Sequence, residues 1–176
     1  RFRNVTGVQT CALPIFRPAR LRDQRKWAQV RSENKEWLTP WEATLPHVPA
    51  GSPASEFISK RPSFFAMVGA LNREARAGRS YSFLIWHGKN LIGQITMGGV
   101  IYGALRGAHI GYWIDRNYAN RGFTTQSVVL LTEFGFAQLG LHRIVINLRP
   151  ENGASRRVAE KAGDRKSTRL NSSHVS

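Results

Sequence analysis

Apolar and polar positions alternate through the middle of the chain in a way typical of β-strands. Two runs, 81–86 and 91–100, are rich in β-branched and aromatic residues, and His87-Gly-Lys-Asn90 between them suits a tight hairpin turn. A second turn leads into a third run at 108–114. The pattern predicts three strands joined as an antiparallel meander.

Apolar positions at helical spacing flank these strands on both sides. Residues 21–34 are polar but carry apolar positions at rough helical spacing. Ser52-Pro53 is typical of a helix start, Pro62 should kink or split that helix, and Gly78 fits its end. After the meander, the pattern predicts a helix over about 124–139.

The rest of the chain adds shorter elements. Residues 142–148 are a short strand of buried character, and a second helix is expected over 152–161. Residues 16–19 fit the stub of a strand. Residues 38–50 contain three prolines and should form a loop. Its apolar residues Trp37, Leu38 and Trp41 either pack on the core or line a site, and we favour core packing.

The order of elements is helices, an antiparallel meander, and then strand, loop, helix, strand and helix. This order favours an α+β (mixed α/β) fold, in which a mixed sheet is covered by helices. No internal repeat or low-complexity tract interrupts it.

The two ends of the chain are antisense to each other. Residues 164–174 read DRKSTRLNSSH, and one possible coding strand for them encodes VTGVQTCALPI, residues 5–15, on its reverse complement. Because unrelated protein ends should not match in this way, the DNA resembles a sequencing-library adapter. We therefore expect residues 1–15 and 164–176 to be adapter-derived, and 16–163 to be a domain that is incomplete at both ends.

Removing the flanks changes what the composition means. The sole cysteine, Cys11, lies in a flank, so the domain should have no disulfide, thiolate metal site or cysteine nucleophile, and we expect no metal. Five of the 26 basic and one of the 11 acidic residues are also flanking, which leaves a net charge of +11. No run reaches the length of a membrane span.

This positive charge has two interpretations. An anionic ligand or partner is one: nucleic acid, the ribosome or a phosphorylated cofactor. The other is a solvated basic surface, since the basic residues are scattered along the sequence. The charge alone leaves both open.

The first segment that could carry chemistry joins Gly111-Tyr-Trp-Ile-Asp115 to Asn120-Arg-Gly-Phe-Thr-Thr125. It predicts a strand that enters a short loop and then a helix, whose first backbone N–H groups and dipole attract anions. Gly122 lets the backbone approach a phosphate closely, and Arg121 adds charge. Many helix starts contain one glycine, so this signal has low specificity by itself.

The second segment runs from Asn147 to Gly163 and reads NLRPENGASRRVAEKAG. Asn152 is placed to cap the last helix, a structural role that holds whatever the function. Ser155 follows one turn later on the same face.

Together the two segments resemble the GNAT superfamily of acetyl-CoA-dependent N-acetyltransferases, in the branch of the ribosomal-protein-alanine N-acetyltransferases. Leu21-Arg-Asp, Trp27, Leu38-Thr-Pro-Trp-Glu42 and Tyr81-Ser-Phe-Leu-Ile85 also resemble that branch. The resemblance covers nearly all of 16–163. It implies a cytoplasmic enzyme with a mostly antiparallel sheet and helices on both faces, followed in the parent protein by two further strands. Without these strands we expect the 176-residue chain to be unstable or inactive.

The resemblance also implies how acetyl-CoA, the cosubstrate, would bind. The pyrophosphate loop would be Ala119, Asn120, Arg121, Gly122, Phe123 and Thr124, followed by Thr125. The family pattern has Gln or Arg where Ala119 stands and Gly or Ala where Thr124 stands, which weakens side-chain contacts but keeps the backbone cradle. Tyr112, Trp113 and Ile114 would bind the pantetheine arm through their backbone, and Asn152 and Ser155 would contact the same arm.

The resemblance says less about the catalytic groups than about the binding of acetyl-CoA. Many family members protonate the departing thiolate with a tyrosine at the position of Ala159, so Ser155 is the expected substitute, directly or through a water. A backbone N–H near Tyr112 would stabilise the oxyanion. Glu42 is the candidate base, acting through water, although a solvated loop carboxylate is the simpler interpretation.

Three functions stay open. The first is acetylation of a protein N-terminal α-amine, with a ribosomal protein as the partner. The second is acetylation of a small-molecule amine, for which the sparse acidic residues are poorly suited. The third is a non-catalytic basic module that binds RNA or the ribosome. We expect no membrane partner and no direct binding of nucleic acid, because no aromatic and basic RNA motif is present.

Overall fold

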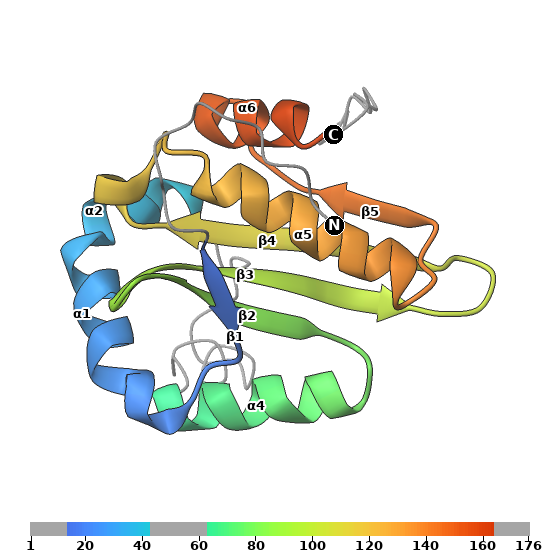
Figure 1. The fold of residues 1–176 in the computed structure, drawn as a ribbon, viewed down its shortest axis with the longest axis horizontal. Coiled ribbons are helices and arrows are strands. Elements are labelled where there is room, and N and C mark those ends of the chain that lie inside the picture. Colours follow the sequence, from blue (N-terminus) through green and yellow to red (C-terminus); the bar gives the residue numbers. More distant parts are fainter. Residues whose placement is uncertain (1–13, 43–62, 164–176) are drawn as a thin grey trace, which may run out of the picture.

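The computed structural model describes residues 14–42 and 63–163, which form a five-stranded sheet with helices on both faces (Figure 1). The strands are β1 (Ile15–Arg17), β2 (Tyr81–His87), β3 (Asn90–Ile101), β4 (Gly107–Ile114) and β5 (Arg143–Ile146). The α-helices are α1 (Gln24–Glu33), α2 (Lys35–Leu38), α4 (Phe64–Arg76), α5 (Phe123–Ala137) and α6 (Gly153–Lys161). Short 3₁₀ helices are η1 (Leu21–Asp23), η2 (Thr39–Trp41) and η3 (Arg116–Tyr118).

The sheet has the order β1-β2-β3-β4-β5. Its first three pairings are antiparallel and only β4 with β5 is parallel, because α5 crosses over between them. The predicted mixed, mostly antiparallel sheet is therefore confirmed. The parallel ladder pairs Gly107 with Arg143 through to Ile110 with Ile146, and β4 continues beyond it to Ile114.

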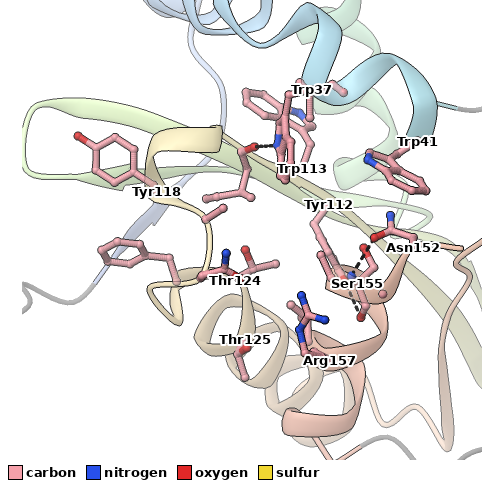
Figure 2. Close-up of a pocket in the computed structure, with 18 of the residues that line it drawn as sticks. Trp37, Trp41, Tyr112, Trp113, Tyr118, Thr124, Thr125, Asn152, Ser155 and Arg157 are labelled. Carbon is pink, nitrogen blue, oxygen red and sulfur yellow. Dashed lines mark hydrogen bonds between the residues drawn. The ribbon is translucent and has the colours of Figure 1, made fainter.

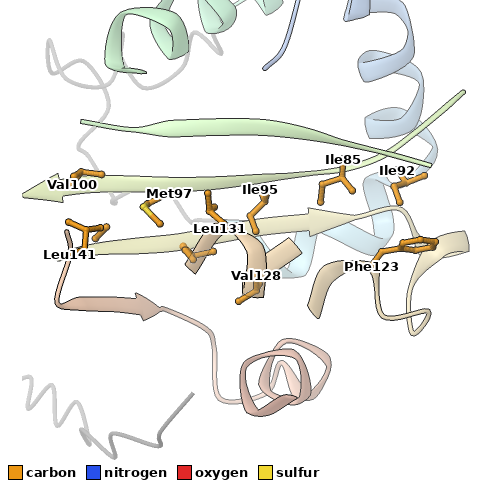
Figure 3. Packing of buried hydrophobic residues seen from close by; sticks show 11 residues of the cluster. Ile85, Ile92, Ile95, Met97, Val100, Phe123, Val128, Leu131 and Leu141 are labelled. Carbon is orange, nitrogen blue, oxygen red and sulfur yellow. The ribbon is translucent and has the colours of Figure 1, made fainter. Parts of the chain in front are cut away.

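Alternation along the strands divides the hydrophobic residues between two faces. On β2, Ile85 joins the cluster under α5, whereas its neighbour Leu84 joins the cluster under α4. Figure 3 shows the larger cluster, in which β-strand side chains meet Val128 and Leu131 of α5. Burial on both faces explains why the strand runs of the sequence are so apolar.

Close packing of α5 on the sheet depends on a residue without a side chain. A Cβ atom on Gly135 would lie 2.6 Å from Ile144 Cδ1 and 2.7 Å from Met97 Cε. Real Cβ atoms do not approach other atoms so closely, so a side chain here would require the ends of the Ile144 and Met97 side chains to shift. Glycine lets α5 pack on the sheet at this point without that shift.

The first strand is tied to the helix layer by an ion pair. Arg17 Nη1 and Nη2 both donate to Asp23, each at 2.7 Å. The hydrogen bonds from Arg17 hold the pKa of the buried Asp23 carboxyl below its usual range. Ile15 also belongs to β1 and pairs with Trp86. The strand thus begins one residue before the boundary expected from the sequence, because ladder pairing uses the backbone and not the side chain.

The predicted loop at 38–50 is wrong in its first part. Lys35–Leu38 is a turn of α-helix, and Thr39–Trp41 continues it as 3₁₀ helix. Pro40 does not prevent this, because the first turn of a helix needs no N–H donor from that residue. Positions 43–50 lie outside the described residues, as do the predicted helix start at Ser52-Pro53 and the kink at Pro62.

Of the boundaries of α4, the sequence predicted the end at Gly78 but not the start at Ser63. Helix α4 is capped by Ser63, whose Oγ accepts from Ala66 N at 3.2 Å, and Gly78 follows its end with φ +70°. None of the helices among residues 14–42 and 63–163 is long and apolar enough to cross a membrane.

Candidate functional site

A cavity of about 880 Å³ lies beside the carboxyl end of β4, between η2 and the first turns of α5 and α6 (Figure 2). It contains nearly every site residue expected from the sequence. These are Glu42, Tyr112, Trp113, Ile114, Ala119, Asn120, Gly122, Phe123, Thr124, Thr125, Asn152 and Ser155. Segments more than a hundred residues apart in the chain thus share one cavity.

The strand that borders the cavity has an unpaired end. Strand β4 pairs with β3 as far as Ile114, but with β5 only through Ile110. The backbone of Tyr112–Ile114 therefore has no strand neighbour on its β5 side among the described elements. An extended ligand can add to such an edge by backbone hydrogen bonds. One acceptor is already in use, since Trp37 Nε1 donates to Ile114 O at 3.1 Å.

The first turn of α5 forms the second wall. Gly122 is the N-cap of this helix, with φ +84°, a left-handed conformation that glycine adopts without strain. A Cβ atom there would meet nothing within 4 Å, so the requirement for glycine is conformational and not one of space. The first N–H groups of α5 have no acceptor within the helix, and its dipole adds positive potential.

The first turn of α6 forms the third wall. Asn152 caps it as predicted, its Oδ1 accepting from Ser155 N at 2.9 Å. Tyr112 donates from its hydroxyl to Ser155 O at 3.3 Å, which joins β4 to α6 (Figure 2). Burial raises the pKa of the Tyr112 phenol, so it stays protonated at neutral pH.

Helix α6 also brings basic side chains that the sequence reading did not single out. The basic residues Arg157 and Lys161 are four residues apart, and Gly153 lies four residues before Arg157. All three line the cavity. Figure 2 shows Arg157 beside Thr124 and Thr125 of α5. The spacing was visible in the sequence, and it could have been read as one basic face directed at an anion.

The opposite end of the cavity is aromatic. Trp37, Trp41 and Trp113 gather there (Figure 2), and Leu38, which follows Trp37 in the chain, also lines the cavity. Core packing, favoured from the sequence, describes only the buried Leu38. Trp41 is 41% exposed, and all four residues line the cavity. The segment that contains Trp37, Leu38 and Trp41 forms a wall of the cavity, which explains its apolar character.

Glu42 lies at this aromatic end and is paired with Arg31 of α1. It is therefore not the solvated loop carboxylate of the simpler interpretation. Its pair is two-thirds or more shielded, with side-chain exposures of 23% for Arg31 and 33% for Glu42. No local pattern in the sequence indicates Arg31, because the contact depends on how α1 and η2 fold together.

Arg121 is the one expected cofactor residue that does not line the cavity. Its guanidinium lies over the ring of Tyr118, 5.3 Å from the ring centre, and Tyr118 is the lining residue. His109 and His142 are exposed and do not line the cavity. Residues 14–42 and 63–163 contain no cluster of three histidine, cysteine or acidic side chains able to hold a metal ion.

The family model for the acetyltransferase (GNAT) domain matches residues 15–165. The chain belongs to this family. The resemblance inferred from the cofactor loop and the Asn152 helix is therefore confirmed.

Individual relatives agree with this assignment. The chain is 42% identical over 73 residues to the probable N-acetyltransferase YjcK of Bacillus subtilis, a match that covers 42% of this chain and 40% of YjcK. It is 24% identical over 145 residues to the ribosomal protein uS5-alanine N-acetyltransferase of Escherichia coli, covering 81% of this chain and 70% of the other. The chain thus spans under half of the length of YjcK.

A solved structure extends the likeness to the fold. Mycobacterium smegmatis RimJ in complex with CoA-disulfide has a TM-score of 0.71 and 33% sequence identity. The alignment covers 84% of this chain and 68% of RimJ. Its agreement over both layers confirms the mixed α/β fold with helices on the two faces of the sheet.

Proposed function

We propose that this protein transfers an acetyl group from acetyl-CoA to a primary amine, the α-amine of a protein N-terminus. One observation carries the proposal. The unpaired end of β4, the glycine-capped start of α5 and the Asn152-capped start of α6 all border a single cavity. An extended arm with a phosphate group fits these three walls in turn.

Each wall has a part in holding the cosubstrate. The pyrophosphate would accept hydrogen bonds from the backbone N–H groups that follow Gly122, with Arg157 adding positive charge. The pantetheine arm would run along Tyr112–Ile114 and past Asn152. Ala119 and Thr124 depart from the family pattern at side-chain positions only, so a cradle made of backbone groups is kept.

The reaction needs a proton removed and a proton supplied. The amine nitrogen attacks the thioester carbonyl carbon, the C–S bond breaks, and the sulfur leaves as a thiolate that takes a proton. Ser155 is the proposed donor to the thiolate, directly or through a water. Glu42 takes the proton of the amine through a water, and a backbone N–H near Tyr112 stabilises the oxyanion.

Two observations support a protein N-terminus as the acceptor. The uS5-alanine N-acetyltransferase of Escherichia coli and the RimJ structure each match about four-fifths of this chain. The net charge of +11 on residues 16–163 is also poorly suited to polyamines or amino sugars, which carry positive charge themselves. A partner in the ribosome, whose RNA is anionic, would be attracted by the same charge.

Calorimetry with acetyl-CoA, followed by a transfer assay, tests the proposal on the protein completed with the two further strands that the family resemblance implies. We expect acetyl-CoA to bind and acetyl to pass to peptides with a free α-amine, but not to the same peptides blocked at the N-terminus. Small amines serve as the comparison. Absence of acetyl-CoA binding would rule out an acetyltransferase, and preference for a small amine would reject the N-terminal acceptor.

A further inference from the structure

The aromatic end of the cavity contains an arginine that is held on three sides. The guanidinium of Arg31 lies 5.3 Å from the ring centre of Trp113 and 5.8 Å from that of Trp27, and it pairs with the carboxylate of Glu42. A cation over an indole face is attracted by the ring electrons, more strongly where water is excluded. Arg31 is therefore fixed between two rings and one anion.

Both rings are themselves held by one residue of the sheet. Gln94 of β3 accepts a hydrogen bond from Trp27 Nε1 at 3.2 Å and another from Trp113 Nε1 at 3.3 Å. Its amide nitrogen donates to Ser82 Oγ at 3.0 Å, which fixes the orientation of the amide. A chain of contacts thus runs from β2 and β3, through two indoles and Arg31, to Glu42.

Glu42 is held from the other side as well. Arg149 Nη2 donates to the backbone oxygen of Glu42 at 3.4 Å, from the segment between β5 and α6. An ion pair that is partly open to solvent adds little to stability. Arg31 holds the side chain of Glu42 and Arg149 holds its backbone, and this arrangement is better explained by a need for the position of the carboxylate than by stability.

We propose that Arg31 is a positioning residue for the acceptor amine. Clamped by Trp27 and Trp113, it holds the Glu42 carboxylate against the cavity, where the carboxylate takes the proton of the amine through a water. The inference rests on the proposed function. It assigns to Arg31 an effect on the acceptor half of the reaction alone, because Arg31 lies against the ring of Trp113 at the aromatic end of the cavity.

A double-mutant cycle in the completed protein, with the two further strands in place, tests this inference. Arg31→Gln should lower kcat/KM for an acceptor peptide by about tenfold and leave the Kd of acetyl-CoA within about twofold. Arg31→Lys, which keeps the charge but not the planar stack, should recover part of the loss. In a Glu42→Gln background, Arg31→Gln should change kcat/KM by less than about twofold, because the two residues act together.

Arg79→Gln is the matched control. Arg79 also forms an arginine–glutamate pair, with Glu74 at 2.7 Å, but at the exposed end of α4 and outside the cavity. It should leave kcat/KM unchanged. Equal effects of Arg31→Gln in both backgrounds, or a parallel loss of acetyl-CoA binding, would overturn the inference.

An NMR measurement separates this inference from the proposed function. Glu42→Gln should shift the indole N–H signals of Trp27 and Trp113, whereas Glu74→Gln should not. If no amine is acetylated, the proposed function fails and the role of Arg31 falls with it. If acetylation proceeds but the cycle is additive, or Glu42→Gln leaves the two indole signals in place, only the Arg31 inference falls.

Discussion

The two ends of the cavity differ in the groups that form their walls. At the starts of α5 and α6 the wall consists of backbone N–H groups and short polar side chains, set by Gly122 and Asn152. At the other end it consists of long side chains, three of them indoles, that come from α2, η2 and β4. A backbone wall tolerates substitutions such as Ala119 and Thr124, whereas a side-chain wall depends on every residue that holds it.

The largest effect should come from Ser155, at the backbone end. Ser155→Ala should lower kcat by about 100-fold if the hydroxyl protonates the thiolate, with the Kd of acetyl-CoA within about threefold, because the capping bond uses the backbone N–H. Rapid-quench kinetics measures kcat, and calorimetry measures the Kd of acetyl-CoA. Tyr112→Phe is the comparison, because the Tyr112 hydroxyl contacts Ser155 O, and a larger loss of kcat there would make Tyr112 the donor.

Gly122→Val should weaken acetyl-CoA binding by about tenfold or more, since a β-branched residue is strained at φ +84° and the N–H groups would turn away. Calorimetry measures the Kd. Gly88→Val is the matched control, because Gly88 also has positive φ, +58°, with open space around it, but lies in the β2–β3 hairpin. It should lower the melting temperature and keep the Kd. Equal Kd values for Gly122→Val and the parent would show that the backbone cradle is not used.

Trp37→Phe should raise the KM of the acceptor by about fivefold and change the Kd of acetyl-CoA by less than about twofold. The ring is kept, but Ile114 O loses its donor and the wall can shift. Steady-state kinetics gives the KM. Trp86→Phe is the control, because Trp86 Nε1 is buried without a hydrogen-bond partner in the described structure. A change confined to acetyl-CoA affinity would mean that the aromatic end does not serve the acceptor.

The smallest effect is expected from Arg121. Because its guanidinium stacks on Tyr118 outside the cavity, Arg121→Gln should raise the Kd of acetyl-CoA by less than about threefold. Arg157→Gln, on the lining face of α6, should raise it more. Calorimetry at low salt compares the two. The reverse order would restore Arg121 as a phosphate contact, as the sequence motif implies.

The two ends of the cavity also differ in how far the sequence predicts them. Gly122 and Asn152 act within one turn of their own helix, so their roles follow from local spacing and were predicted with the correct helix starts. The segment that contains Trp37 and Trp41 was predicted as a loop and, mostly, as core. The three prolines of 38–50 led to the prediction of a loop where the chain forms a short helix. The apolar character of the segment could indicate either a core or a cavity wall.

The sequence by itself determined the strands, the helix caps and the family, because alternation, helical spacing and capping each depend on near neighbours along the chain. Only the tertiary structure decided that Arg31 meets Glu42 between Trp27 and Trp113, and that Arg121 turns away onto Tyr118. The contacts of Arg31 join residues whose distance in space is set by the packing of α1 on the sheet. The local sequence pattern carries no information about that distance, which is determined by the packing of the core in both layers.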